Sequence, residues 1–242
     1  YLQKDNNEII LSKTLRLMGV GESTAEHLIK DILIKQTNPT IAPLAKEGEV
    51  CFRITAKSND KEKCYALIKD TEKKLNQRFG KYIFGTEKDS IELVVVELLL
   101  SKGLTVTAAE SSSCGIIASM LSNCKSKPNV FDMGYVLHSA DALVNILGLD
   151  KTEIEFNGCT SKWAAKEMAL KALKNTNANL AVSTTQCIFD EANKVGIVYI
   201  GISDGTHTTA KELRIVGSVD RIKHLSAKYA LNELRLFLDA DN

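Results

Sequence analysis

The sequence lacks the features that mark membrane-spanning, nucleic-acid-binding, zinc-binding and disulfide-rich proteins. It contains no run of about 18 or more apolar residues, so we expect no membrane-spanning segment. Its net charge is only +1, which does not favour a surface that binds nucleic acid. The six cysteines are scattered and include no C-x-x-C pair, which argues against a zinc site and a disulfide framework. We therefore expect free thiols, no metal and a cytoplasmic location.

The chain has 242 residues, of which 44% are apolar, enough for one large or two modest cored domains. It begins with Tyr1, and its first residues have no signal pattern, so we expect it to be part of a longer protein.

The first third of the chain alternates between strand-like and helix-like patterns. Two prolines fall in one polar stretch, residues 36–49, which predicts a loop there, and Ser23 is a plausible cap for the first helix. The predicted strands are 8–18, 49–57 and 81–85, and the predicted helices are 24–35 and 60–80. This βαβαβ order predicts a small α+β domain.

A polar, turn-prone stretch at residues 86–90 predicts the domain boundary, giving domains 1–86 and 87–242. Beyond it, helices and strands interleave, which predicts an α/β layered domain with helices on the sheet faces. The predicted helices are 90–103, 139–148, 160–176 and 218–239, and the predicted strands are 134–139, 178–186, 194–205 and 207–217.

The stretch "TVTAAESSSCGIIASML", residues 105–121, runs from a strand through three serines and a Cys-Gly pair into a helix. Such a turn places hydroxyls and free N–H groups at a helix N-terminus, where anions are stabilised. The serines are either ordinary helix caps or part of an active site. Cys114, beside the helix N-terminus, is either a reactive thiol or a small buried side chain.

Several of these motifs identify a family. "TAAES", "GYVLHS", "GCTS", "LAVS" and "VGIVYIGI" occur in the order found in the C-terminal domain of the competence/damage-inducible CinA family, which the second block resembles. "SKTLRLMGVGES" and "QTNPTIAPLAKEGEV" are similar to the KH-type middle domain of that family. The resemblance implies a three-layer α/β/α domain preceded by a KH-type α+β domain. It also implies nicotinamide-mononucleotide deamidase activity, without a cofactor, as in many family members.

The resemblance also implies site residues. Ser111 falls on the serine regarded as the family nucleophile, and His138 replaces a family tyrosine and is the candidate substitute base. The residues expected to contact substrate are Glu110, Ser113, Gly115, Tyr135, Ser183, Thr185 and Arg221.

The sequence departs from the family at three of these motifs. Leu143 stands where the family has the lysine proposed as general base, Cys114 replaces a glycine, and residues 185–190 lack the glycines and proline of the substrate loop. An apolar side chain transfers no proton, so we expect a degraded site in a pseudoenzyme that binds a nucleotide or a protein partner. The alternative is a nicotinamide-mononucleotide amidohydrolase that uses Ser111 with a different base. We expect a pyridine-nucleotide ligand and a homo-oligomer, and no nucleic-acid or membrane partner.

Overall fold

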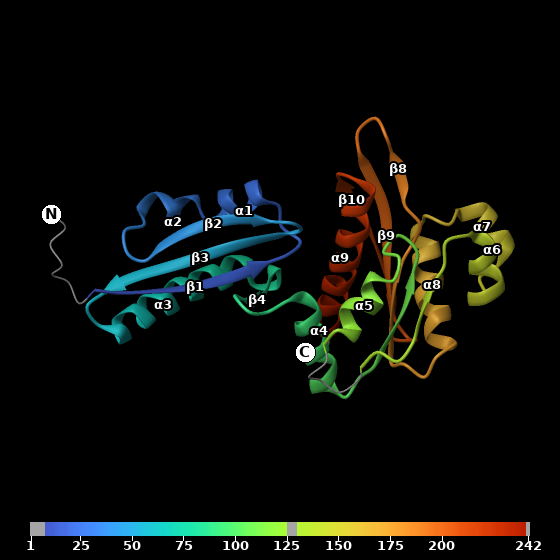
Figure 1. The fold of residues 1–242 in the computed structure, drawn as a ribbon, viewed down its shortest axis with the longest axis horizontal. Helices are drawn as coiled ribbons and strands as arrows, with labels where there is room; N and C mark the ends of the chain where they lie inside the picture. The colour runs from blue at the N-terminus through green and yellow to red at the C-terminus, as the bar shows by residue number, and fades with distance from the viewer. Residues whose placement is uncertain (1–7, 125–129, 241–242) are drawn as a thin grey trace. The chain divides into compact units, whose positions relative to one another are not determined.

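The computed structural model describes residues 8–124 and 130–240. Residues up to Ser90 belong to one compact unit and residues from Ile91 to a second (Figure 1). The predicted fold class is confirmed, because a small α+β unit is followed by a layered α/β unit. No helix among the described residues has the length and apolar character needed to cross a membrane.

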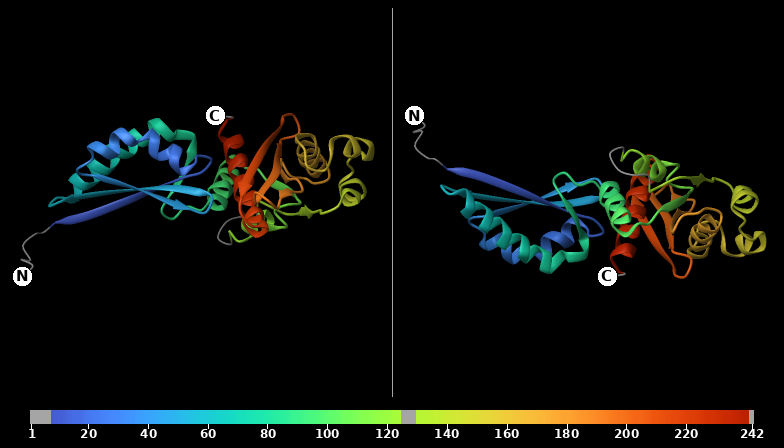
Figure 2. Two further views of the ribbon diagram at one scale, coloured as in Figure 1. Left: turned by 90° about the horizontal axis from the view of Figure 1, so that it is seen from above. Right: turned by 90° about the horizontal axis from the view of Figure 1, so that it is seen from below.

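The first unit is a four-stranded antiparallel sheet with its helices on one face (Figure 2). The sheet order is β2-β3-β1-β4. The strands are β1 Ile9–Leu17, β2 Thr40–Lys46, β3 Glu49–Ser58 and β4 Ile83–Thr86, and the helices are α1 Glu22–Leu28, α2 Lys30–Lys35, α3 Lys61–Phe79 and the short 3-10 helix η1 Gly80–Tyr82. Phe52 of β3 and Phe79 of α3 pack in the core, with ring centroids 5.1 Å apart.

Three sequence predictions for this unit are wrong. The predicted loop at residues 36–49 contains β2, so the sheet has a strand more than expected. Proline is tolerated in β2 because that strand lies at the sheet edge, where a missing N–H costs little. The predicted helix 24–35 is two helices broken at the buried Ile29, and Ser23 lies inside α1, whose N-cap is Gly21.

The second unit has a sheet of order β10-β9-β7-β5-β6, with the short β8 paired to β9. Strands β6, β5 and β7 are parallel, and β9 runs antiparallel to β7 and β10. The strands are β5 Val106–Glu110, β6 Gly134–Val136, β7 Leu180–Thr184, β8 Ile188–Asp190, β9 Val195–Ser203 and β10 Thr208–Val216. The helices are α4 Ile91–Lys102, α5 Ile116–Ser122, α6 Ala140–Ala142, the π-helix η2 Leu143–Leu147, α7 Lys151–Asn157, α8 Lys162–Lys174 and α9 Val219–Ala240.

This unit has three layers. Helices α5 and α9 pack on one face of the sheet, with α4 against both of them, and α8 packs on the other face (Figures 1 and 2). Strands β5 and β7 are buried along their whole length, as expected for strands covered on both faces. Because β5, β6 and β7 are parallel, the segments that follow them emerge at the same edge of the sheet.

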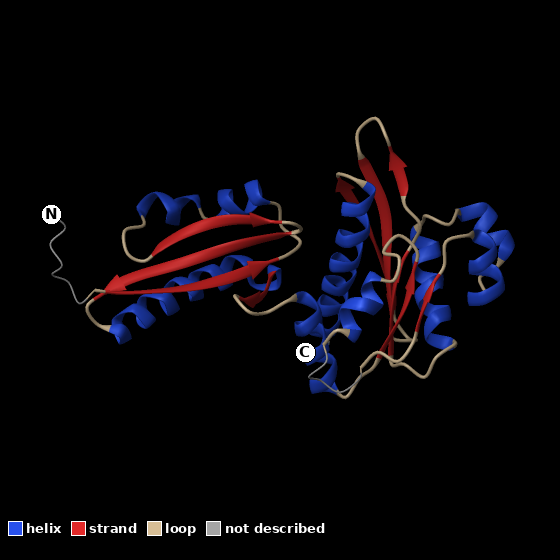
Figure 3. Ribbon diagram, in the orientation of Figure 1, coloured by secondary structure: helices blue, strands red, loops and turns tan. Residues whose placement is uncertain are grey.

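The structure also corrects details of this unit. The predicted strand 134–139 ends at Val136, so His138 lies beyond β6. The predicted helix 139–148 is the short α6 followed by the π-helix η2. Helix α7 and strand β8 were not predicted. Strand β8 forms a hairpin with β9, visible in Figure 3.

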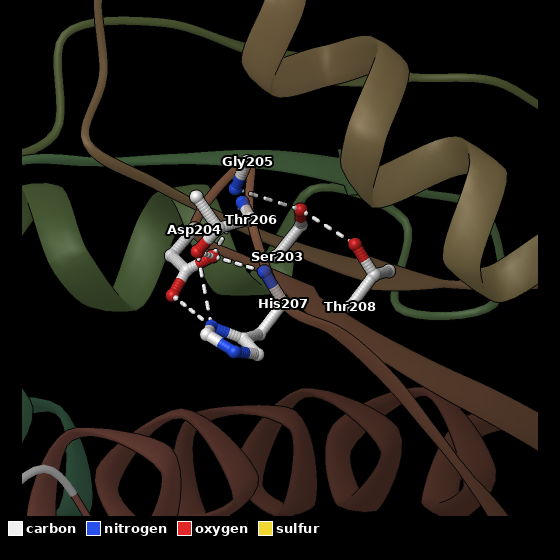
Figure 4. Close-up of polar contacts among 6 residues, drawn as sticks. All are labelled: Ser203, Asp204, Gly205, Thr206, His207 and Thr208. Atoms are coloured by element: carbon white, nitrogen blue, oxygen red, sulfur yellow. Dashed lines mark hydrogen bonds and ion pairs between the residues drawn. The ribbon is translucent and has the colours of Figure 1, made fainter.

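The turn between β9 and β10, whose polar contacts are drawn in Figure 4, lies at the end of the sheet where β9 pairs with the start of β7. The Oδ1 atom of Asp204 accepts hydrogen bonds from the backbone N–H groups of Thr206 and His207, at 2.7 and 2.6 Å, and from the Thr206 hydroxyl at 2.9 Å. Partial burial opposes ionisation of Asp204, but these hydrogen bonds outweigh it and lower its pKa to about 2.

Candidate functional site

The serine turn, which we define as Ser111 to Gly115, joins β5 to α5. The Ser111 and Ser112 N–H groups donate to the carbonyl oxygens of Thr184 and Thr185, at 2.9 and 3.0 Å, so the turn begins as a continuation of the β5–β7 pairing. The chain then reverses through two left-handed residues, Cys114 with φ 54° and Gly115 with φ 86°. A side chain at the first of these is strained, since L-residues rarely adopt that region.

The carboxylate of Glu110 lies beneath this turn and is 1% exposed. Its Oε2 atom accepts from the N–H groups of Gly115 and Ile117, both at 3.0 Å, and from the Ser113 hydroxyl at 2.7 Å. Its Oε1 atom accepts from the Ala118 N–H at 2.9 Å. The buried carboxylate therefore caps α5 with three backbone N–H groups and one hydroxyl.

Because three N–H groups at the start of α5 donate to Glu110, they are not available to stabilise an oxyanion. Two further N–H groups are also engaged, because Cys114 donates to the Ser111 carbonyl and Ile116, the first residue of α5, to the Ser113 carbonyl. Within the described chain, the Ser113 N–H is the one group from Ser111 to Ala118 without an acceptor. An oxyanion hole is usually a preorganised set of donors aimed at one point, and the start of α5 does not offer such a set.

A pocket of about 460 Å³ lies over the serine turn at the carboxyl edge of the parallel strands. It is lined by Ser111, Ser112, Cys114, His138, Gln186, Cys187, Phe189, Val219, Ile222 and Lys223. The hydroxyl oxygens of Ser111 and Ser112 are buried and have no hydrogen-bond partner among the described residues. Buried hydroxyls are normally bonded, so this pair points to a polar ligand or water in the pocket.

His138 and Ser111, the predicted base and nucleophile, line the same pocket. They are not hydrogen-bonded to each other, because the Ser111 hydroxyl has no partner within the described ranges. The His138 side chain is exposed, and its backbone carbonyl accepts from Nε2 of Gln186 at 2.6 Å. The structure thus brings the two residues to one site without the contact that base catalysis requires.

Leu143, which stands where the family has its lysine, is fully buried at the start of η2. It packs in a hydrophobic cluster with Leu147, Leu149 and Met168. It is therefore a core residue and does not line the pocket.

Lys223 of α9 is a site residue that the sequence analysis missed. It lines the pocket and has no hydrogen bond or ion pair in the described part of the chain. Val219 precedes it by one helical turn and lines the same pocket, so the two share a face of α9. The pocket thus has a positive charge on one wall and the aromatic ring of Phe189 on another.

The other predicted substrate contacts lie outside the lining. Thr185 and Ser183 are both fully buried: Ser183 donates its hydroxyl to the Ala165 carbonyl on α8 at 2.6 Å, and Thr185 bonds to Tyr199 on β9. Tyr135 packs against the hydrophobic cluster of Leu143, and Arg221 is exposed near the start of α9. Ser113 and Gly115 belong to the serine turn itself, and Glu110 lies beneath it and caps α5.

The sequence analysis expects free thiols and no disulfide framework. All six cysteines lie in the described ranges and none of them forms a disulfide, and burial raises the pKa of Cys187 in the pocket and of Cys159 outside it. Among residues 8–124 and 130–240, no group of three or more His, Cys, Asp or Glu side chains is arranged to hold a metal ion.

Comparison with known proteins assigns both units to one family. Residues 88–238 match the model of the CinA C-terminal domain, and residues 12–85 match the model of the damage-inducible protein CinA KH domain. A putative competence-damage inducible protein of Caldicellulosiruptor bescii is 37% identical over 97% of this chain and 58% of its own length. A CinA-like protein of Kosmotoga olearia is also 37% identical, with the same coverage. The chain thus spans about three-fifths of the length of these relatives.

Solved structures agree on the fold. A CinA superfamily protein from Klebsiella pneumoniae is 19% identical with a TM-score of 0.57, covering 62% of this chain and 96% of that one. A CinA superfamily protein from Escherichia coli is 23% identical with a TM-score of 0.54, covering 62% of this chain and 92% of that one. At such identities the likeness concerns the fold alone.

Proposed function

This chain belongs to the CinA family, and we propose that its second unit binds a pyridine nucleotide in the serine-turn pocket without hydrolysing the amide. The observation that carries the proposal is the burial of Leu143 in the core, where the family resemblance implies a general base. The pocket still has hydroxyl groups without hydrogen-bond partners among the described residues, so we propose that it binds the nucleotide but does not hydrolyse it.

The argument against turnover is one of proton transfer. A serine hydroxyl near neutral pH needs a base to take its proton, and that assistance is worth about 10²–10⁴ in rate. The Ser111 hydroxyl has no hydrogen-bond partner among the described residues, and three N–H groups at the start of α5 donate to Glu110. Nucleophile activation and oxyanion stabilisation are thus both weakened.

The argument for binding rests on polar groups in the pocket that lack hydrogen-bond partners within the described residues. The Ser111 and Ser112 hydroxyls would gain the hydrogen bonds they lack from a polar ligand. The Lys223 ammonium suits a phosphate group, and Phe189 offers an apolar wall for an aromatic ring. A mononucleotide with an aromatic base carries all three complementary features.

Calorimetric titration with nicotinamide mononucleotide tests this proposal. We expect saturable binding by the unmodified chain, weakened about tenfold in Lys223→Gln through loss of one charge-assisted contact. Lys166→Gln, at an exposed position on α8, is the matched control and should bind normally. No binding at millimolar ligand, or equal binding by Lys223→Gln, would contradict the proposal.

The second candidate function is nicotinamide-mononucleotide amidohydrolase. The observation that favours it is that Ser111 and His138 line one pocket. It requires His138 to move into hydrogen-bond contact with Ser111 when substrate binds, and ammonia release distinguishes it from binding alone.

We further propose that the chain forms a homo-oligomer, that its ligand is neither nucleic acid nor membrane, and that it acts in the cytoplasm. Light scattering on the purified chain tests the first of these. A monomeric mass at all concentrations would contradict it.

A further inference from the structure

We infer that Gln186 is a latch that closes the serine-turn pocket over Ser111 and Ser112 through its hydrogen bond to the His138 carbonyl. The latch controls access to the site, and it rests on the proposed function only for the identity of the ligand that enters. The residue acts through the His138 segment, so it is a positioning residue and not a catalytic one.

The backbone of Gln186 is fixed on its own side of the pocket. Its carbonyl oxygen accepts from the hydroxyls of Thr160 and Thr185, at 3.1 and 2.9 Å. Thr185 is itself held by Tyr199, since each residue's N–H donates to the other, at 3.0 Å in both cases. These bonds hold the chain after β7, so the freedom at this position lies in the Gln186 side chain.

The segment that receives the latch is fixed as well. The Leu137 N–H donates to the Glu110 carbonyl at 2.8 Å, and the Ser139 hydroxyl accepts from the Ala142 N–H at 3.0 Å to cap α6. The His138 carbonyl lies between these two anchors. The 2.6 Å bond from Nε2 of Gln186 therefore joins two anchored segments across the pocket.

The two serines beneath are covered although they line the pocket. Ser111 is 2% exposed and Ser112 is 9% exposed, and the oxygen of each hydroxyl is buried without a partner within the described residues. A ligand in the pocket can therefore bond these hydroxyls only after a covering group moves. The latch requires that rotation of the Gln186 side chain, which breaks one hydrogen bond, uncovers them without moving the backbone.

A thiol placed under the latch reports its opening. In Ser111→Cys, the rate of alkylation by iodoacetamide at position 111 is followed by peptide mass spectrometry. Cys159, which is half-buried and outside the lining, serves as internal reference for opening of the whole unit. Adding Gln186→Met removes the donor while keeping size and neutrality, and should raise the rate at position 111 about three- to tenfold, the effect of one lost hydrogen bond. Cys159 should be unaffected.

Asn157→Leu is the control, because Asn157 also donates its amide to a backbone carbonyl, that of Glu153, and to the Glu153 carboxylate, away from the pocket. It should leave the rate at position 111 unchanged. If Ser111→Cys does not fold, Ser112→Cys reports on the same site.

An equal rate with and without Gln186→Met would overturn the latch, as would a parallel rise at Cys159. This readout involves no nucleotide. A faster rate at position 111 together with no nucleotide binding would support the latch while sinking the proposed function, so the two failures are distinguishable.

Discussion

The Oε2 atom of Glu110 lies 3.0 Å from the backbone nitrogen of Gly115, at the start of the helix that it caps. Replacing this carboxylate by an amide in Glu110→Gln weakens the acceptor and turns an NH₂ group toward buried N–H donors. We expect the free energy of unfolding to fall by about 1–3 kcal/mol, measured by urea denaturation. Glu155→Gln, at an exposed position on α7, is the control and should change it by less than about 0.5 kcal/mol. Equal stabilities for the two variants would contradict the capping role.

Cys114 occupies a left-handed conformation that a glycine adopts without strain. Relief of backbone strain in Cys114→Gly is worth about 1–2 kcal/mol, and the added backbone entropy costs about 0.5–1 kcal/mol. We therefore expect the free energy of unfolding to rise by up to about 1.5 kcal/mol. Thermal unfolding measures it. Ser112→Gly is the matched variant without a left-handed backbone and should lower the melting temperature. A drop in both variants would show that the Cys114 thiol contacts outweigh the strain.

Asp204 makes the stability of the second unit depend on pH. Its pKa is lowered to about 2 in the folded state, against about 4 in an unfolded chain. The stabilisation is therefore fully present above the unfolded pKa and is lost as the pH falls toward 2. Asp204→Asn should be less stable than the unmodified chain by about 1 kcal/mol at pH 7 and nearly equal to it near pH 2. A difference independent of pH would contradict this account.

The boundary between the proposed domains 1–86 and 87–242 should be the first site of limited proteolysis. The segment is partly held to the first unit, because the Asp89 carboxylate accepts from the N–H and hydroxyl of Thr86, at 2.7 and 2.9 Å, and Arg16 donates to the Asp89 carbonyl. Asp89→Ala removes the first two bonds and should speed tryptic cleavage after Lys88 about three- to tenfold. Residues 105–121 hold no Lys or Arg, so a protease of broad specificity is used in parallel, and early cuts within 105–121 would refute the boundary.

The layered class of the second unit followed from sequence. So did the strand that opens residues 105–121 and the strand predicted at 178–186, observed as Val106–Glu110 and Leu180–Thr184, since short apolar runs between helical patterns are typical of buried strands. Strand β2 could not be predicted, because Pro43 within it and Pro39 just before it indicate a loop until the strand's place at the sheet edge is known. The break at Ile29 and the short β8 are likewise set by tertiary packing, which a local pattern does not report.

At the site, the motifs were enough to predict that the serine turn and His138 lie in one pocket, because both follow parallel strands. The capping role of Glu110 could not be predicted, because a carboxylate that caps a helix and one that binds substrate look alike in sequence. Lys223 was also missed, because it lies on the amphipathic α9 amid other charged residues and only the packing of that helix brings it to the pocket.

Ammonia release from nicotinamide mononucleotide is the most direct test of a binding site without turnover. It should be measured for the unmodified chain, Ser111→Ala, His138→Ala and Leu143→Lys. We predict no release above background from the first three and at best partial gain in Leu143→Lys, because the added amine starts from a buried core position. Robust turnover by the unmodified chain that is lost in both Ser111→Ala and His138→Ala would contradict the account and make His138 the base.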